Sequence, residues 1–140
     1  MRRHARTVAI AACGVIFAGC QTAASMGSMW GYVSQSESVA SLRVLVYMPD
    51  RPTCEVSRAK DMKQAASAAW AKLTVPTECR PVVITPAQSK VDYWVFPVSG
   101  EVTVGATERD WCMTLRDVLV QYYSVLFVTR CEPVGADFTR

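Results

Sequence analysis

The stretch VDYWVF at residues 91–96 is the most strand-like part of this 140-residue chain and decides its fold class. It places large side chains on both faces, as a central strand does when both faces are covered. The turn-forming pair at 99–100 (SG) follows, so the segment at 101–104 (EVTV) is predicted to be its hairpin partner. Toward the N-terminus, 80–85 (RPVVIT) and 42–48 (LRVLVYM) are two further strand candidates. We therefore expect a mainly antiparallel sheet.

A single amphipathic helix is expected between two of these strands. Its apolar side chains recur at steps of three and four residues, which gives one stripe for packing on the sheet. The stripe consists of Ala59, Met62, Ala66, Ala69, Trp70 and Leu73, with Lys60, Asp61, Gln64 and Lys72 on the other faces. Pro76 ends the helix. The predicted fold is therefore α+β, with one amphipathic helix packed on a small, mainly antiparallel sheet.

The segment at 111–131 fits two descriptions. A helical stripe is formed by Leu115, Val118, Leu119, Tyr122 and Leu126. Eight of the twelve residues at 118–129, however, are Val, Tyr, Phe or Thr, which favour strands. We predict a strand hairpin that turns near 121–122, with a helix as the alternative.

The first 20 residues, MRRHARTVAIAACGVIFAGC, have the form of an export signal. Three arginines precede an uncharged apolar run at 7–18; positive residues hold the N-terminus inside while a short apolar helix enters the translocon. The run is shorter than the roughly 20 residues that span a bilayer. The leader also contains the only histidine, His4. Residues 20–140 consequently hold equal numbers of basic and acidic side chains, twelve of each.

The end of the leader, Phe17-Ala18-Gly19-Cys20, resembles the lipobox of bacterial lipoprotein precursors. In that family the signal peptide, here 1–19, is removed, and the cysteine is acylated on its sulfur and on its new amine. The resemblance implies that Cys20 carries the acyl chains, palmitate among them, and anchors the mature protein in the lipid bilayer. Gln21 follows in place of the aspartate that retains enterobacterial lipoproteins at the inner membrane. This implies the periplasmic face of the outer membrane.

Two alternatives to lipidation at Cys20 stay open. Ile10-Ala11-Ala12-Cys13 also fits a lipobox, but only six uncharged residues precede its cysteine. A signal's apolar region usually has roughly 7–15 residues. In the second alternative an ordinary signal peptidase cleaves the leader, and Cys20 is discarded or left as a free thiol.

After the lipobox, a tether is predicted to precede the domain. Residues 20–41 are rich in Ser, Ala and Gly with a single charge, a composition typical of a flexible linker. Trp30 and Tyr32 interrupt it, and we expect them to dock on the domain rather than lie in the headgroup layer. The single globular domain is predicted at 42–132, followed by a C-terminal tail at 133–140.

The four remaining cysteines are Cys54, Cys79, Cys112 and Cys131, and an even number in an exported domain indicates disulfides. Of the three possible connectivities we favour 54–79 with 112–131, and the other two stay open. A helix unbroken from Cys54 to Leu73 would be too long for six residues to reach back, so the first bridge requires a helix that starts near 57. The wide cysteine spacing predicts neither a zinc site nor a redox motif.

Composition excludes several kinds of active site. Without a histidine after residue 19, neither a Ser-His-Asp nor a Cys-His site can form. Two acidic groups, Asp50 with Glu55 and Glu101 with Glu108 and Asp110, are better explained as solvated charge than as catalytic carboxylates. The zero net charge of residues 20–140 argues against a nucleic-acid surface. We expect no enzyme, no cofactor and no metal.

Two functions are considered for such a domain. Its order of elements loosely resembles small envelope-assembly lipoproteins of the curli-secretion or synthase-activator type. That resemblance implies a non-enzymatic accessory or interaction module with an envelope protein as its partner. The alternative is a small disulfide-bonded inhibitor of a secreted enzyme such as lysozyme. Glu101, Glu108 and Asp110 would then present an acidic loop to a basic enzyme.

Overall fold

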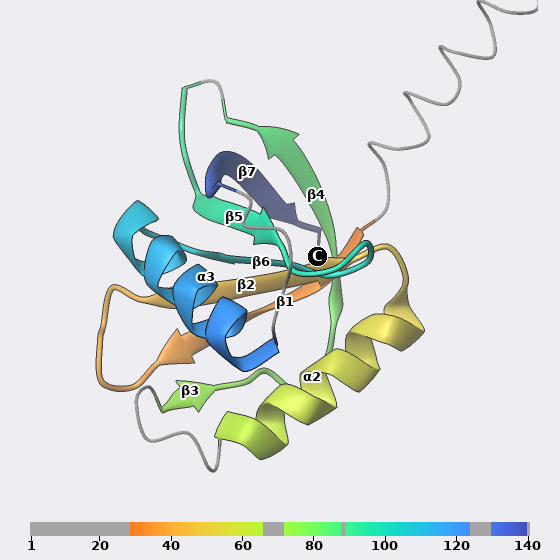
Figure 1. Ribbon diagram of the computed structural model, residues 1–140. Helices are drawn as coiled ribbons and strands as arrows, with labels where there is room; N and C mark the ends of the chain where they lie inside the picture. The colour runs from red at the N-terminus through yellow and green to blue at the C-terminus, as the bar shows by residue number, and fades with distance from the viewer. Residues whose placement is uncertain (1–28, 66–71, 88, 124–129, 140) are drawn as a thin grey trace, which may run out of the picture.

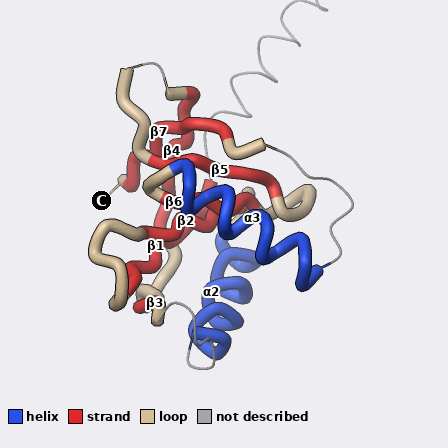
Figure 2. The backbone as a smooth tube through the Cα atoms, turned by 60° about the vertical axis from the view of Figure 1, so that its left-hand side comes forward, coloured by secondary structure: helices blue, strands red, loops and turns tan. Residues whose placement is uncertain are grey.

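The computed structural model describes residues 29–65, 72–87, 89–123 and 130–139, which form two helices and seven strands (Figure 1). In chain order the elements are β1 (Met29–Ser36), β2 (Arg43–Met48), α2 (Arg51–Ala65), β3 (Leu73–Thr74), β4 (Arg80–Pro86), β5 (Tyr93–Pro97), β6 (Thr103–Ala106), α3 (Arg109–Tyr123) and β7 (Glu132–Phe138). Every strand pair is antiparallel. The two helices pack on the outside of the sheet (Figure 2).

Six of the strands close into a barrel. The strand order is β2-β6-β5-β7-β4-β1, and β1 pairs with β2 as well, so the ring is complete. The short strand β3 pairs with the far end of β1, beyond the part that pairs with β4. Closure gives each of these six strands a partner on both sides, although the β1–β4 and β5–β7 pairings cover only three residue pairs each.

Alternate residues of the strands divide between two hydrophobic cores. The barrel interior contains the buried side chains Leu45, Tyr47, Val82, Tyr93 and Val95. The second core, between the barrel and the helices, includes Val44, Val46, Met48 and Phe96 from β2 and β5, together with the four bonded cysteines. Because β2 and β5 are buried on both faces, their sequences are apolar throughout rather than alternating with polar residues.

A disulfide bond fastens each helix to the barrel. Cys54, in the first turn of α2, is bonded to Cys79, which directly precedes β4. Cys112, in the first turn of α3, is bonded to Cys131, which directly precedes β7. The Cα–Cα distances of 6.3 and 6.2 Å are ordinary for disulfides. The favoured connectivity is confirmed.

The fold consists of two halves that repeat each other. In both halves a hairpin is followed by a helix and then by a strand: β1, β2, α2 and β4 form the first half, and β5, β6, α3 and β7 form the second. Exchanging the halves leaves the set of strand pairs unchanged. The pair β1–β2 becomes β5–β6, β1–β4 becomes β5–β7, and β2–β6 and β4–β7 are pairs of equivalent strands.

The residue register obeys the same two-fold relation. Trp30 lies opposite Pro81 in the first half, and Trp94 lies opposite Pro133 in the second. On the axis, equivalent residues face each other, as Val46 does with Val104 and Ile84 with Ala136. The bonded cysteine is the fourth residue of each helix. Residues at the same distance from that cysteine are therefore equivalent in α2 and α3.

The helix α3 replaces the strand hairpin predicted at 111–131. The described residues are helical through 121–122, where the turn was expected. Leu115 and Leu119 pack against the core between helices and barrel, while Thr114 and Asp117 are exposed. Packing this apolar stripe outweighs the strand preference of individual Val and Tyr residues. The α+β class is confirmed, but the described residues contain two helices rather than one.

The helix α2 begins earlier than expected. It starts at Arg51 rather than near 57, and its described part ends at Ala65. Leu73, predicted to lie in the helix, belongs to β3. The helix therefore does not run unbroken from Cys54 to Leu73, and Cys54 bonds to Cys79 from within the first turn of α2.

The helix α2 also turns a different face to the barrel than its apolar spacing predicts. Ala59 and Met62 are exposed, whereas Asp61 is half-buried. Cys54 is fully buried, and its disulfide brings the face that it shares with Asp61 against β1. Ala66, Ala69 and Trp70, the other members of the predicted stripe, lie outside the described residues.

Both ends of the folded domain extend beyond the predicted range of 42–132. The strand β1 occupies 29–36 within the expected tether 20–41, and β7 occupies 132–138 where a tail at 133–140 was expected. Alternation explains both corrections, because alternate side chains of these strands pack in the barrel core, namely Met29, Val33, Val134, Ala136 and Phe138. Eight residues, 21–28, thus separate Cys20 from β1.

Candidate functional site

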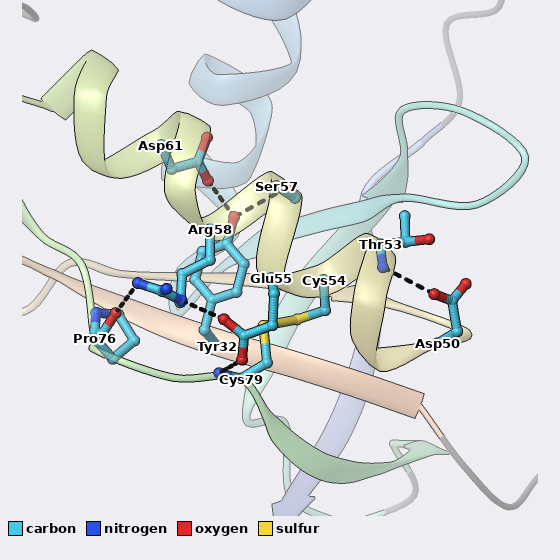
Figure 3. The surroundings of a disulfide bond; sticks show 10 residues. All are labelled: Tyr32, Asp50, Thr53, Cys54, Glu55, Ser57, Arg58, Asp61, Pro76 and Cys79. Carbon is cyan, nitrogen blue, oxygen red and sulfur yellow. Dashed lines mark hydrogen bonds and ion pairs between the residues drawn. A yellow bond between two sulfur atoms is a disulfide. The ribbon is translucent and has the colours of Figure 1, made fainter.

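A polar network around the Cys54–Cys79 disulfide holds α2 to the segment before β4 (Figure 3). The backbone N–H of Cys79 donates to Glu55 Oε1 at 2.9 Å, and Arg58 Nε donates to Glu55 Oε2 at 2.9 Å. Arg58 also donates from Nη1 to the carbonyl oxygen of Pro76 at 3.1 Å. The hydrogen bond from Cys79, and then the one from Arg58, keep the pKa of Glu55 below its ordinary value.

On the inner face of α2, Tyr32, Ser57 and Asp61 form a second group of contacts, here termed the polar cluster. Tyr32 extends from β1 with 2% of its surface exposed and donates its hydroxyl hydrogen to Asp61 Oδ2. Ser57 Oγ lies 3.2 Å from the same hydroxyl oxygen. Burial raises the pKa of Asp61, while burial and the nearby Asp61 carboxylate raise the pKa of Tyr32. The hydrogen bonds of the polar cluster connect α2 to β1.

The second half has apolar residues at the equivalent positions. Phe96 takes the place of the tyrosine, opposite Val104 as Tyr32 is opposite Val46. Leu115 and Leu119, three and seven residues after the helix cysteine, take the places of the serine and the aspartate. Because the same framework accepts an apolar set, the fold itself does not require the polar cluster.

The outer side of α2 carries apolar side chains that its inner side lacks. Val56 is 60% exposed and Met62 is 44% exposed. The exposed side of α2, as the term is used below, consists of Arg51, Pro52, Val56, Ala59, Lys60, Met62 and Lys63. In α3 the positions equivalent to Pro52, Val56 and Ala59 hold Asp110, Thr114 and Asp117, all exposed. The two helices therefore differ in polarity on their inner faces and at these three positions of their outer sides.

An arginine at the start of each helix lies over a tryptophan of the preceding hairpin. Arg51 Cζ is 5.2 Å from the centroid of the Trp30 ring, and Arg109 Cζ is 5.7 Å from that of Trp94. Both distances fall within the range of a cation–π interaction. Since the contact occurs in both halves, it belongs to the fold. In the first half it places the start of β1 beside the first turn of α2.

The acidic residues considered as catalytic groups or as an acidic loop lie apart or have structural partners. Asp50 accepts the backbone N–H of the third residue of α2 at 2.8 Å, and this cap lowers its pKa. Glu55 belongs to the network around the disulfide. Glu101 lies in the β5–β6 turn, at the opposite end of β6 from Glu108 and Asp110, which stand at the start of α3. These three residues therefore do not share one loop.

Within the described ranges, no group of three or more His, Cys, Asp or Glu side chains is arranged to hold a metal ion. None of the helices in that part of the chain is both long and apolar enough to cross a membrane. The predicted lipidation residue, Cys20, lies outside the described residues. Comparisons with known protein families, with curated proteins and with solved structures find no match to this chain.

Proposed function

We propose that this chain is a non-enzymatic outer-membrane lipoprotein, anchored through acylated Cys20 on the periplasmic side, that serves as an interaction module in an envelope assembly. The observation that carries the proposal is a sequence at 17–20 that resembles a lipobox, followed by a domain whose four cysteines are joined in two disulfides. Disulfides form and persist in oxidising compartments such as the periplasm. The leader and the domain thus support the same location.

A binding role suits the side chains of the domain better than a catalytic one. The hydroxyl groups of the polar cluster are engaged within the cluster, and Asp50 and Glu55 accept structural hydrogen bonds. The exposed side of α2, in contrast, offers apolar and cationic groups to the surroundings. Exposed apolar groups beside charged ones are a common feature of contact surfaces.

Metabolic labelling with radioactive palmitate tests the anchor. In a bacterial host, the parent chain and a Cys13→Ala variant should incorporate the label and fractionate with the outer membrane. A Cys20→Ala variant should lose both properties. Unchanged labelling of Cys20→Ala would refute the proposed anchor, and loss of labelling in Cys13→Ala alone would move it to the first lipobox.

Cross-linking in intact membranes tests the role of the domain. We expect a defined envelope protein to be recovered with the parent chain, and recovery of monomer alone would count against an interaction module. An assay of lysozyme activity with the purified domain distinguishes the other function considered from sequence. Inhibition that charge reversal at Glu108 and Asp110 abolishes would replace the present proposal with that of an inhibitor.

A further inference from the structure

The geometry points to the exposed side of α2 as a membrane-contact surface that lies in the anionic headgroup layer of the bilayer in which Cys20 is anchored. The anchor itself rests on the proposed function. The contact is a separate property of α2, which the unacylated chain would retain. The occupant to which the inference commits is a bilayer containing anionic phospholipid.

Two apolar groups of this surface, Val56 and Ala59, are not needed for folding. The helix α3 occupies the equivalent place on the same framework with Thr114 and Asp117 where α2 has Val56 and Ala59. A folded domain normally turns such apolar groups inward. In α2 they point outward, while the half-buried Asp61 and Ser57 face the barrel. These outward apolar groups would therefore be buried by contact with an apolar environment outside the domain.

The charges of α2 complement an anionic surface. Arg51, Lys60 and Lys63 are exposed along the helix. Its acidic residues are withdrawn, because Glu55 is paired with Arg58 at 2.9 Å and Asp61 is hydrogen-bonded to a buried tyrosine. Helices that lie in the membrane interface combine lysines with apolar side chains in this manner. Lysine and arginine are each attracted to anionic headgroups.

The length and attachment point of the tether bring this surface close to the bilayer. Only residues 21–28 separate Cys20 from β1, and a fully extended chain of that length spans about 30 Å. The domain therefore cannot move far from an acylated Cys20. Trp30, at the start of β1, lies against Arg51 in the first turn of α2. The tether therefore joins the domain next to the first turn of α2, which is one end of the exposed side of α2.

Vesicle binding by the mature chain without its acyl group tests the contact directly. The protein is residues 20–140 with Cys20→Ser, which contains every described residue. It is sedimented with vesicles of phosphatidylcholine alone and of phosphatidylcholine mixed with phosphatidylglycerol. We expect binding only to the anionic vesicles, weakening as salt concentration rises. This assay gives its answer whether or not Cys20 is acylated in cells, so the two proposals can fail separately.

Two variants with the same change in charge locate the surface. Ala59→Asp places a carboxylate on α2 where α3 already has Asp117, and Thr114→Asp adds the same charge to α3. We expect Ala59→Asp to weaken binding roughly tenfold, and Thr114→Asp to leave it within about twofold of the parent. Circular dichroism verifies that both variants fold. Val56→Thr, which copies Thr114, replaces Ala59→Asp if the latter unfolds, and should also weaken binding.

Three results would overturn the inference. The first is a parent chain that does not bind anionic vesicles, and the second is equal weakening by the variants in α2 and α3. The third is a concentration-dependent dimer, detected by sedimentation velocity without lipid, that Ala59→Asp dissociates. That last result would assign the exposed side of α2 to a second copy of the chain.

Discussion

The two halves of the barrel share a framework and differ in how they hold their helices. In the second half, Leu115 and Leu119 of α3 pack on the barrel, as an amphipathic helix ordinarily does. In the first half, the corresponding face of α2 carries Ser57 and Asp61, which hydrogen-bond to Tyr32 of β1. Strand register and disulfide position are the same in both. The difference therefore lies in side-chain chemistry and not in architecture.

Because of this difference, the two disulfides contribute unequally to holding their helices against the barrel. Burying a leucine side chain contributes roughly 1.5–3 kcal/mol, whereas a hydrogen bond contributes about 1 kcal/mol net. The helix α3 thus has a substantial attachment besides Cys112–Cys131. The helix α2 has less apolar attachment and relies more on Cys54–Cys79 and the polar network beside it. Because a disulfide and polar contacts hold the inner face of α2, its apolar side chains Val56 and Met62 can lie on the outer face.

Removing each disulfide in turn should have the largest effect on stability and should show the difference between the two helices. Cys54→Ala/Cys79→Ala and Cys112→Ala/Cys131→Ala should each lower the free energy of unfolding by about 3 kcal/mol, because each bridge closes a loop of similar length. The two variants should differ locally. Hydrogen exchange should show α2 opening in the first variant before the rest of the domain, while α3 stays protected in the second. Equal opening of both helices would contradict the unequal attachment.

The polar cluster can be converted to the apolar set of the other half. Tyr32→Phe alone should lower the free energy of unfolding by about 1 kcal/mol, because it leaves the half-buried carboxyl of Asp61 without its donor. Adding Ser57→Leu and Asp61→Leu should restore or exceed the stability of the parent, since apolar replacement of a buried polar group is often stabilising. Urea denaturation measures both. A triple variant less stable than Tyr32→Phe would show that the two frameworks are not interchangeable.

The reverse substitution provides the matched control. Phe96→Tyr introduces a hydroxyl opposite Leu115 and Leu119, where neither side chain can accept its hydrogen bond. It should lower the free energy of unfolding by about 1–3 kcal/mol. A neutral Phe96→Tyr would mean that the hydroxyl finds another partner, and that Tyr32 is not specific to the first half.

The strands in the middle of the sequence, β2, β4 and β5, could be predicted from sequence. The first and last strands, β1 and β7, could not. The runs around Val46, Ile84 and Val95 are apolar on both faces, a pattern that polar linkers do not show. The strand β1 contains Gly, Ser and Gln, and β7 contains Gly and Pro, so composition alone predicts a tether and a tail. Their strand character arises from pairing with distant residues that close the barrel. Local sequence does not contain that information.

The site was harder to predict because its decisive residues contradict the apolar spacing. Ala59 and Met62 form a regular stripe, yet the Cys54–Cys79 disulfide and Tyr32 bring the opposite face to the barrel. The internal repeat does leave a trace in the sequence. The motif Arg-x-x-Cys occurs at 51–54 and 109–112, and Cys-x-Pro-Val occurs at 79–82 and 131–134. Aligning these motifs pairs residues 51–65 with 109–123 and so would have predicted the same kind of element in both segments.

The smallest effect, and the sharpest test of the polar cluster, is its pH dependence. Burial raises the pKa of Asp61 in the folded state, so folding favours the protonated carboxyl. That stabilisation is fully present below the ordinary aspartate pKa of about 3.9 and is lost as pH rises through the raised pKa. The difference in unfolding free energy between the parent and Asp61→Asn should therefore become less favourable to the parent as pH rises from about 4.

Asp50 and Glu55, whose pKa values are lowered, act in the opposite direction, because their stabilisation is lost as pH falls. Both are present in the parent and in Asp61→Asn, so their contributions cancel in the difference. Denaturation curves of the two proteins across the acid range isolate Asp61. A difference that does not change with pH would mean that Asp61 ionises as it does in water, and that Tyr32 holds α2 without the help of a retained proton. No corresponding dependence can arise in the second half, where Leu119 stands in the place of the aspartate.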